Sequence, residues 1–417
     1  MLAPVNPKIN SDRLWKSLMD LAKIGATEKG GVRRLALTAL DGQGRDLVVS
    51  WFKEAGMSVR VDRVGNIFAR RAGKKDALPV ATGSHIDTQP SGGKFDGNYG
   101  VLAGLEVVRT LNDLGIETDA PIEVCVWTNE EGSRFTPVMM GSGVWAGVFS
   151  AEHVLGQKDI DGKVVEDELK AIGYLGPEVL GPGGKQPGFK AYFESHIEQG
   201  PVLEDAKLPI GVVTGALGQR WFDVVVTGME AHAGPTPMNL RKDALLAASM
   251  LVQEVNRIAL SESPHGRGTV GSMRVGPNSR NVIPGQVIFS VDFRHPSNDG
   301  LDRMHATLQQ ACDRVKVQCS VDITLTIVSE FAASAFDKDC VAAVRKAADQ
   351  HGLASMEIVS GAAHDAVYVS RVCPTGMIFI PCKDGISHNE IEDALPEHVE
   401  AGCNVLLGAM LKMANAE

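Results

Sequence analysis

The sequence contains no cluster of lysine and arginine, no long apolar run and no signal-peptide core. Its 417 residues carry a formal net charge of −10, and the clustered positive charge that nucleic acids require is missing. No apolar stretch reaches the roughly 18 residues that span a bilayer, and the N-terminal segment lacks the apolar core of a signal peptide. We therefore expect a cytoplasmic protein with neither a nucleic-acid nor a membrane partner.

Paired-cysteine motifs are also missing. The seven cysteines form no C-x-x-C pair and show no regular spacing: Cys125, Cys312, Cys319, Cys340, Cys373, Cys382 and Cys403. An odd, scattered set is typical of a reducing compartment, where thiols fill small apolar positions. The sequence therefore predicts cysteines with structural roles.

Apolar residues are plentiful, at 44% of the chain, and this length favours two domains. In residues 1–214 and again in 328–417, short apolar strands alternate with helices. This alternation predicts an α/β domain whose mostly parallel sheet is covered on both faces. Residues 215–327 follow the order βαββαβ, the ferredoxin-like arrangement, which predicts a second domain inserted into the first.

Residues that can bind metal ions follow the predicted strands of the α/β domain. They are His85, Asp96, Glu131, His196 and His388. Chemistry in such sheets gathers beyond the carboxyl ends of the strands, so these side chains can form one site. Imidazole and carboxylate are the usual ligands of Zn²⁺, Mn²⁺, Co²⁺ and Ni²⁺. Five ligands with one bridging carboxylate would bind two ions, although any one of them alone is more often an ordinary hydrogen-bonded residue.

Neighbouring carboxylates extend this site. Asp87 follows His85 with the spacing H-x-D, so its side chain can hold the second ring nitrogen and fix the tautomer. Glu130 and Glu131 are adjacent at the end of an apolar strand. One of the two can bind metal while the other accepts a proton from water and later protonates a leaving nitrogen. The residues therefore favour metal-assisted hydrolysis.

Five motifs resemble those of the M20 metallopeptidase-type amidohydrolases: GSHIDTQPSGGKFDGNYGV, TNEEGSRF, ESHIEQGPVLE, GMEAHAGPTPMNLRKDAL and SGAAHDAV…SHNE. They occur in the family's order between about residues 60 and 400. The chain is most similar to the branch that holds N-carbamoyl-L-amino-acid hydrolases, β-ureidopropionases and allantoate amidohydrolases. His196 marks this branch, because many peptidase relatives carry an acid there.

The resemblance implies a role for each residue. The ligands would form two sets that share one bridging carboxylate: His85 and His196 for one ion, Glu131 and His388 for the other, and Asp96 between them. Glu130 would be the general base and Asp87 the orienting carboxylate. The two divalent ions would be Zn²⁺, or Mn²⁺, Co²⁺ or Ni²⁺.

Substrate contacts also follow from the resemblance. Gln199 would face the metals, and His232 would polarise the scissile carbonyl, often from the neighbouring subunit of a homodimer. Asn281 and Arg294 would hold the substrate carboxylate, to which the planar guanidinium of arginine is well suited. Residues 215–327 would then be a lid and dimerisation domain. The sequence leaves two roles open for His364, support of the metal site or capping of a helix.

The resemblance implies hydrolysis of the carbamoyl C–N bond of a small carboxylate-bearing ureido compound. The substrate would be an N-carbamoyl-L-amino acid or N-carbamoyl-β-alanine, and the products an amino acid, CO₂ and ammonia. Allantoate amidohydrolase is the alternative, but Trp221 stands where the allantoate branch carries a basic residue. A non-catalytic binding protein of the same fold is a remote third hypothesis, because the ligands and the base are all present.

Overall fold

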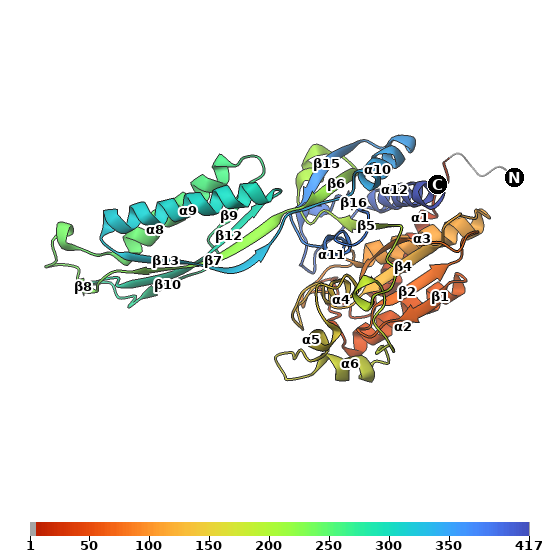
Figure 1. Cartoon of the computed structure of the whole chain (residues 1–417), viewed down its shortest axis with the longest axis horizontal. Helices are drawn as coiled ribbons and strands as arrows, with labels where there is room; N and C mark the ends of the chain where they lie inside the picture. The colour runs from red at the N-terminus through yellow and green to blue at the C-terminus, as the bar shows by residue number, and fades with distance from the viewer. Residues whose placement is uncertain (1–5, 417) are drawn as a thin grey trace. The chain divides into compact units, whose positions relative to one another are not determined.

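The strands of the chain pair into two main sheets, each with its own apolar core (Figure 1). The computed structural model describes residues 6–416. It divides into unit 2, Gly215–Ala335, and unit 1, which holds the described residues on either side. The expected boundary at 327 falls inside β13 (Asp322–Phe331), which pairs along its length with β7 (Gly218–Thr227). Unit 2 therefore extends to Ala335.

The larger sheet has nine strands in the order β1-β2-β4-β3-β5-β16-β6-β14, with β15 beside β6. Their bounds are β1 (Ser58–Val61), β2 (Ile67–Arg71), β3 (Val80–His85), β4 (Ile122–Trp127), β5 (Ala191–Ile197), β6 (Ile210–Ala216), β14 (Ser334–Ala335), β15 (Ser355–Ser360) and β16 (Thr375–Ile380). The four central strands β4, β3, β5 and β16 run parallel, and antiparallel strands flank them. Every residue of these four strands is buried. The predicted mostly parallel α/β sheet is confirmed.

Helices lie on both faces of this sheet. Those of unit 1 are α1 (Ser11–Ala22), α2 (Ala39–Glu54), α3 (Asn98–Asp113), α4 (Met140–Trp145), α5 (Ala151–Leu155), α6 (Val165–Ala171), α7 (Val202–Ala206), α10 (Lys338–Gln350), α11 (Asp365–Val369) and α12 (Pro396–Ala414), with short 3₁₀ turns η1 (Pro182–Gly184) and η3 (Lys383–Gly385). Gly104 of α3 packs on Val124 of β4, whereas Trp145 of α4 packs on Trp127 with ring centroids 5.6 Å apart. Val124 and Trp127 point to opposite faces because side chains alternate along a strand.

Unit 2 carries a five-stranded antiparallel sheet in the order β10-β12-β7-β13, with β9 beside β12. Its further elements are β8 (Ala231–His232), η2 (Met238–Leu240), α8 (Ala244–Ser261), β9 (Arg267–Thr269), β10 (Met273–Gly276), β11 (Val282–Ile283), β12 (Gln286–His295) and α9 (Asn298–Cys319). The longer elements follow the order βαββαβ. Alternate residues of β12 are buried, which directs Phe289 and Phe293 into the core that α8 and α9 share.

All seven cysteines are free, and six of them are buried. Between residues 6 and 416, no helix combines the length and the apolar character that crossing a membrane requires.

Candidate metal centre

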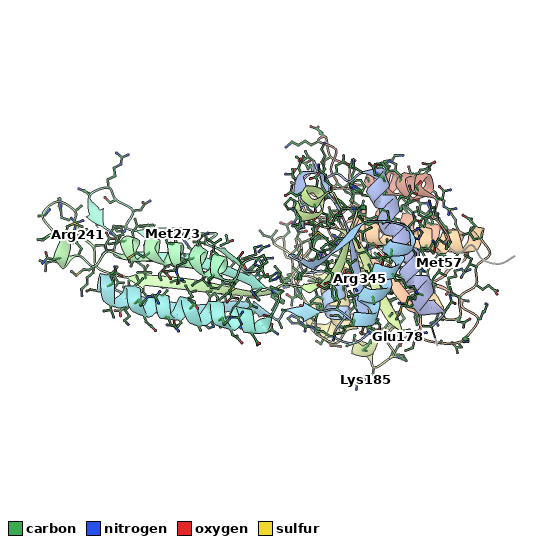
Figure 2. All side chains as sticks on the ribbon, turned by 90° about the horizontal axis from the view of Figure 1, so that it is seen from above. Met57, Glu178, Lys185, Arg241, Met273 and Arg345 are labelled. Carbon is green, nitrogen blue, oxygen red and sulfur yellow. The ribbon has the colours of Figure 1, made fainter. Side chains whose placement is uncertain are left out.

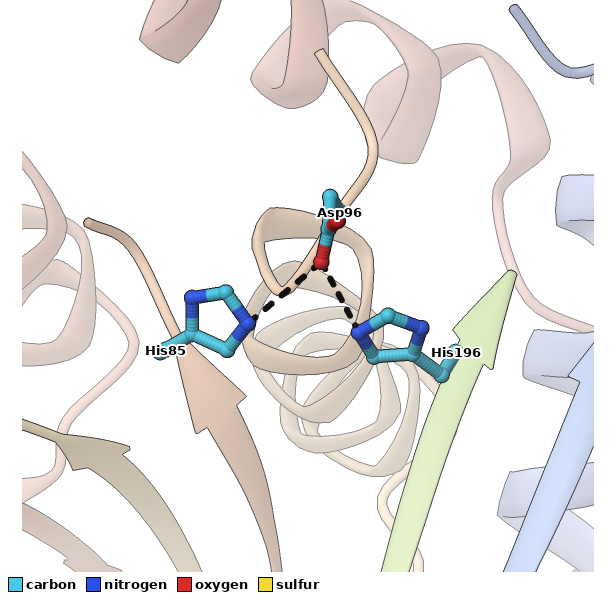
Figure 3. Close-up of side chains that lie close together, drawn as sticks. All are labelled: His85, Asp96 and His196. Atoms are coloured by element: carbon cyan, nitrogen blue, oxygen red, sulfur yellow. Dashed lines mark ion pairs between the residues drawn. The ribbon is translucent and has the colours of Figure 1, made fainter. Parts of the chain in front are cut away.

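The first set of ligands comes from two neighbouring parallel strands and one loop. His85 ends β3, and His196 is the last residue but one of β5. Asp96 lies in the loop between β3 and α3. Its Oδ1 is 3.5 Å from Nε2 of His85 and 3.2 Å from Nε2 of His196 (Figure 3). All three side chains are buried, so the carboxyl ends of the strands meet at one enclosed cluster.

Gly97 brings the loop close to His85. Its φ of 66° is in the left-handed region, and a Cβ there would lie 2.4 Å from Cε1 of the His85 ring. Glycine is suited to this position because it adopts positive φ freely and carries no side chain. The fold of the loop, and with it the place of Asp96, therefore depends on Gly97.

The second set of ligands uses the other oxygen of Asp96. Oδ2 lies 3.3 Å from Nε2 of His388, which is 3.4 Å from Oε2 of Glu131. Within each set the ligand atoms lie within 4.8 Å of one another. The structure thus brings the five residues together in two sets that share Asp96. The sets differ in exposure, since the His388 side chain is 51% exposed and that of His85 only 2%.

The histidine rings are oriented for metal binding. Nδ1 of His85 lies 2.9 Å from the carbonyl oxygen of Asp87, and Nδ1 of His196 lies 2.9 Å from that of Ile197. A carbonyl oxygen only accepts hydrogen bonds, so each Nδ1 carries a hydrogen. Each Nε2 faces Asp96 and is the ring nitrogen that can bind a cation once it is free of a proton. Imidazole nitrogens and buried carboxylates together fit divalent cations of the Zn²⁺, Mn²⁺, Co²⁺ and Ni²⁺ group.

Asp87 differs from the expectation in how it reaches His85. Its carboxylate Oδ1 is 3.9 Å from Nδ1, and the main-chain carbonyl of Asp87 takes the hydrogen bond instead. The carboxylate accepts the backbone N–H groups of Glu130 and Glu131, at 3.3 and 3.4 Å. Asp87 therefore orients His85 through its main chain and holds the turn of the two glutamates through its side chain.

Glu130 lies beside the first set. Its Oε2 is 3.5 Å from Nε2 of His85, and the residue is 9% exposed. Burial and the negative charges of Asp365 and Glu131 raise the pKa of Glu130 well above its usual range. For Glu131, burial and the charge of Asp96 raise the pKa to about 7. Several buried carboxylates can ionise together only beside positive charge, which is a second reason why the cluster fits cations.

Gln199 contacts the second set of ligands. Its Nε2 donates to Oδ2 of Asp96 at 2.9 Å and to Oγ of Ser387 at 3.2 Å, and it lies 3.4 Å from Nε2 of His388. Its amide oxygen is buried without a hydrogen-bond donor. Gln199 therefore touches the ligands directly and leaves one acceptor unsatisfied beside them.

His364 packs against a ligand. It occupies the N-cap position of α11, but its side chain makes no capping hydrogen bond. The ring lies 4.4 Å from that of His196, centroid to centroid, and its Nε2 is 3.1 Å from Oγ of Ser360. Burial lowers the pKa of His364 well below its usual range, which keeps the ring neutral. Of the two open roles, the contacts favour support of the metal site.

The remaining predicted residues lie on unit 2, in or beside two different sheets: His232 and Asn281 at the two-stranded sheet of β8 and β11, and Arg294 on β12 of the five-stranded sheet. His232 of β8 pairs with Val282 of β11, and the carbonyl of Asn281 accepts the N–H of Ala233. Arg241 holds this loop through the carbonyl of Ala233, and Figure 2 shows Arg241 at one end of the unit.

Arg294 lies toward the opposite end of β12, where its guanidinium contacts Asp292 at 3.0 Å. From Gln286, where the β11 loop joins β12, to Arg294 the strand rises about 26 Å at roughly 3.3 Å per residue. The structure therefore does not bring Arg294 and Asn281 of one chain together.

An outer layer of polar residues around the ligands was not predicted from the sequence. Glu392 and Ser387 contact Asp96, while Glu194 accepts the hydroxyl of Ser84 at 2.7 Å and the N–H of Ala366 at 2.9 Å. Burial and the charge of Asp96 raise the pKa of Glu392 to about 7. The glycine pair at 92–93 is the local sequence feature that could have indicated these contacts, because paired glycines allow another chain segment to approach closely.

The parallel sheet and the paired ligand sets define a class of protein, the metal-dependent hydrolases with an α/β catalytic unit. The chain matches the model of Peptidase family M20/M25/M40 over residues 81–412. It belongs to this family, whose enzymes depend on metal ions.

Individual relatives resemble the chain along nearly its whole length. An N-carbamoyl-L-amino-acid amidohydrolase of Rhizobium meliloti is 49% identical, over 99% of this chain and 99% of the relative. An allantoate amidohydrolase of Bacillus subtilis is 34% identical, over 94% and 95%. The crystal structure of an amidase of the hydantoinase/carbamoylase family from Burkholderia multivorans has 58% identity and a TM-score of 0.95, covering 98% of this chain and 99% of that one.

Proposed function

We propose that this protein hydrolyses the carbamoyl C–N bond of N-carbamoyl amino acids, using two divalent cations. The observation that carries the proposal is the position of Asp96, which offers one oxygen to His85 and His196 and the other to His388 and Glu131. The relative with 49% identity is named for N-carbamoyl-L-amino acids, and this supports the choice of substrate.

The residues of the chain account for the proton transfers. Divalent cations, when bound, would polarise the ureido carbonyl and make a water molecule more acidic. Glu130 accepts a proton from that water as its oxygen attacks the carbamoyl carbon, and donates the proton to the amino nitrogen as the C–N bond breaks. The products are the amino acid and carbamic acid, which decomposes to CO₂ and ammonia.

The substrate carboxylate and carbonyl need further contacts, which we assign to Gln199, His232, Asn281 and Arg294. Asn281 and Arg294 are far apart within one unit 2, so one chain cannot offer both to one small carboxylate. A homodimer removes this difficulty if His232 and Asn281 of one copy and Arg294 of the other serve the same substrate. Unit 2 would then act as lid and dimerisation domain.

We also place the protein in the cytoplasm, where its seven free thiols would stay reduced.

A substrate panel tests the proposal. Protein loaded in turn with Mn²⁺, Co²⁺, Ni²⁺ or Zn²⁺ is assayed for ammonia release from N-carbamoyl-L- and D-amino acids, N-carbamoyl-β-alanine and allantoate. We expect the highest kcat/KM for an N-carbamoyl amino acid. Preference for allantoate would favour the activity for which the Bacillus subtilis relative is named. No turnover with any metal would leave a binding protein of the same fold.

A further inference from the structure

Glu392 connects the two loops that carry Asp96 and His388. It follows His388 in the segment between β16 and α12, and its side chain reaches the segment between β3 and α3. There its Oε1 accepts the backbone N–H groups of Phe95 and Asp96, at 3.0 and 3.1 Å. The residue is 1% exposed. Hydrogen bonds shielded from water are stronger than exposed ones, so this contact restrains both loops.

Ser387 makes a second connection between the same loops. Oε2 of Glu392 lies 2.9 Å from Oγ of Ser387, which lies 3.1 Å from Oδ2 of Asp96. Oδ2 is the oxygen that faces His388. Glu392 thus reaches Asp96 twice, directly at its backbone and through Ser387 at the oxygen of the second ligand set.

The loop of Asp96 is shaped to admit this side chain. A Cβ on Gly93 would lie 2.1 Å from Oε1 of Glu392, which is closer than two non-bonded atoms can approach. Glu390, two residues earlier, makes only a 3.6 Å ion pair with the exposed Lys29. The burial and the contacts therefore distinguish Glu392 from its neighbour of the same residue type.

We propose that Glu392 is a positioning residue that holds Asp96 in place relative to His388 and so sets the affinity for the second cation. The inference rests on the proposed function, in which two cations bind. Binding of the first cation depends less on Glu392, because two of its ligands, His85 and His196, come from adjacent strands of the rigid sheet. The second cation depends on two loops, and Glu392 joins them.

Metal titration of the full chain tests this role without relying on activity. Metal-free wild-type protein and Glu392→Ala are titrated with Co²⁺, and bound metal is measured by absorption and by elemental analysis after equilibrium dialysis. Loss of an outer hydrogen-bonding partner weakens metal binding by about 10–100-fold. We expect Glu392→Ala to weaken binding of the second cation by about this factor and binding of the first cation much less.

Three further variants make the result decisive. Glu390→Ala is the matched control and should bind both cations as wild type does. Glu392→Gln keeps an acceptor oxygen for the two N–H groups and should bind both cations nearly as wild type does. Gly93→Ala displaces an intact Glu392 and should weaken binding of the second cation, which tests the role if Glu392→Ala does not fold. Unchanged binding of the second cation in Gly93→Ala, or equal weakening of both cations, would overturn the proposal. Wild-type protein that binds no cation would contradict the proposed function itself.

Discussion

The carboxylate oxygen Oε2 of Glu130 lies 3.5 Å from Nε2 of His85, next to the first ligand set but outside both sets. Glu130→Gln should therefore leave two cations bound per chain and remove the base. Loss of general acid–base catalysis costs about 10²–10⁴-fold in rate, and we expect kcat for an N-carbamoyl amino acid to fall by this factor. Metal analysis of the same sample is the control. Near-normal turnover would exclude Glu130 from the mechanism.

Binding of the second cation should release protons. In the metal-free protein the hydrogen bond with Asp96, together with the charge of Glu131, raises the pKa of His388 to about 9. Below that pH the imidazolium must lose its proton before Nε2 can bind a cation. Affinity for the second cation should therefore increase as pH rises toward about 9. Calorimetric titration in buffers of different ionisation enthalpy measures the protons released, and His388→Ala should abolish the second binding step.

Gly97→Ala should displace His85 and lower the affinity for the first cation. The new Cβ would meet the imidazole at 2.4 Å, at a φ of 66° that L-residues avoid. Gly115 is the matched control, because it follows the other end of α3 with a φ of 61°, and a Cβ added to it would meet no atom within 4 Å. Both variants should lose stability because alanine disfavours a positive φ, by about 1–2 kcal/mol for Gly115→Ala and by more for Gly97→Ala, where the clash adds to it. Only Gly97→Ala should lose metal, and equal metal content in the two variants would contradict this account.

Mixed variants test the homodimer. Arg294→Ala and Asn281→Ala should each be nearly inactive alone, because each lacks one contact to the substrate carboxylate. If the contacts come from different copies, a heterodimer of the two variants contains one intact site. A mixture refolded or exchanged together should then be more active than either variant. No recovery in a mixture shown to contain heterodimers would contradict the shared site and remove at least one of the two contacts from it.

The sequence predicts the sheet, and the clustering of the candidate ligands, because both follow short-range patterns. Continuous apolar strands such as residues 122–127 indicate buried parallel strands, and polar residues directly after them indicate a site at the carboxyl edge. His85 and Glu131 follow from this pattern. The order βαββαβ follows from the same alternation of apolar periodicity in unit 2.

Side-chain directions and long-range contacts are what the sequence could not give. The spacing H-x-D places both the carbonyl and the carboxylate of Asp87 near His85, and only the fold determines which of them makes the bond. Glu392 contacts a segment almost three hundred residues earlier in the chain, so no local pattern separates it from Glu390. Arg294 and Asn281 are close in sequence but are separated by the length of a strand.

Stepwise metal reconstitution is the most direct test of a two-cation hydrolase. Metal-free protein is mixed with increasing equivalents of Mn²⁺ or Zn²⁺, and ammonia release from an N-carbamoyl-L-amino acid is measured at each ratio. We predict negligible activity without metal and a maximum at two equivalents per chain, because Asp96 belongs to both ligand sets. Full activity in the metal-free protein, or a maximum at one equivalent with no further binding, would contradict the account.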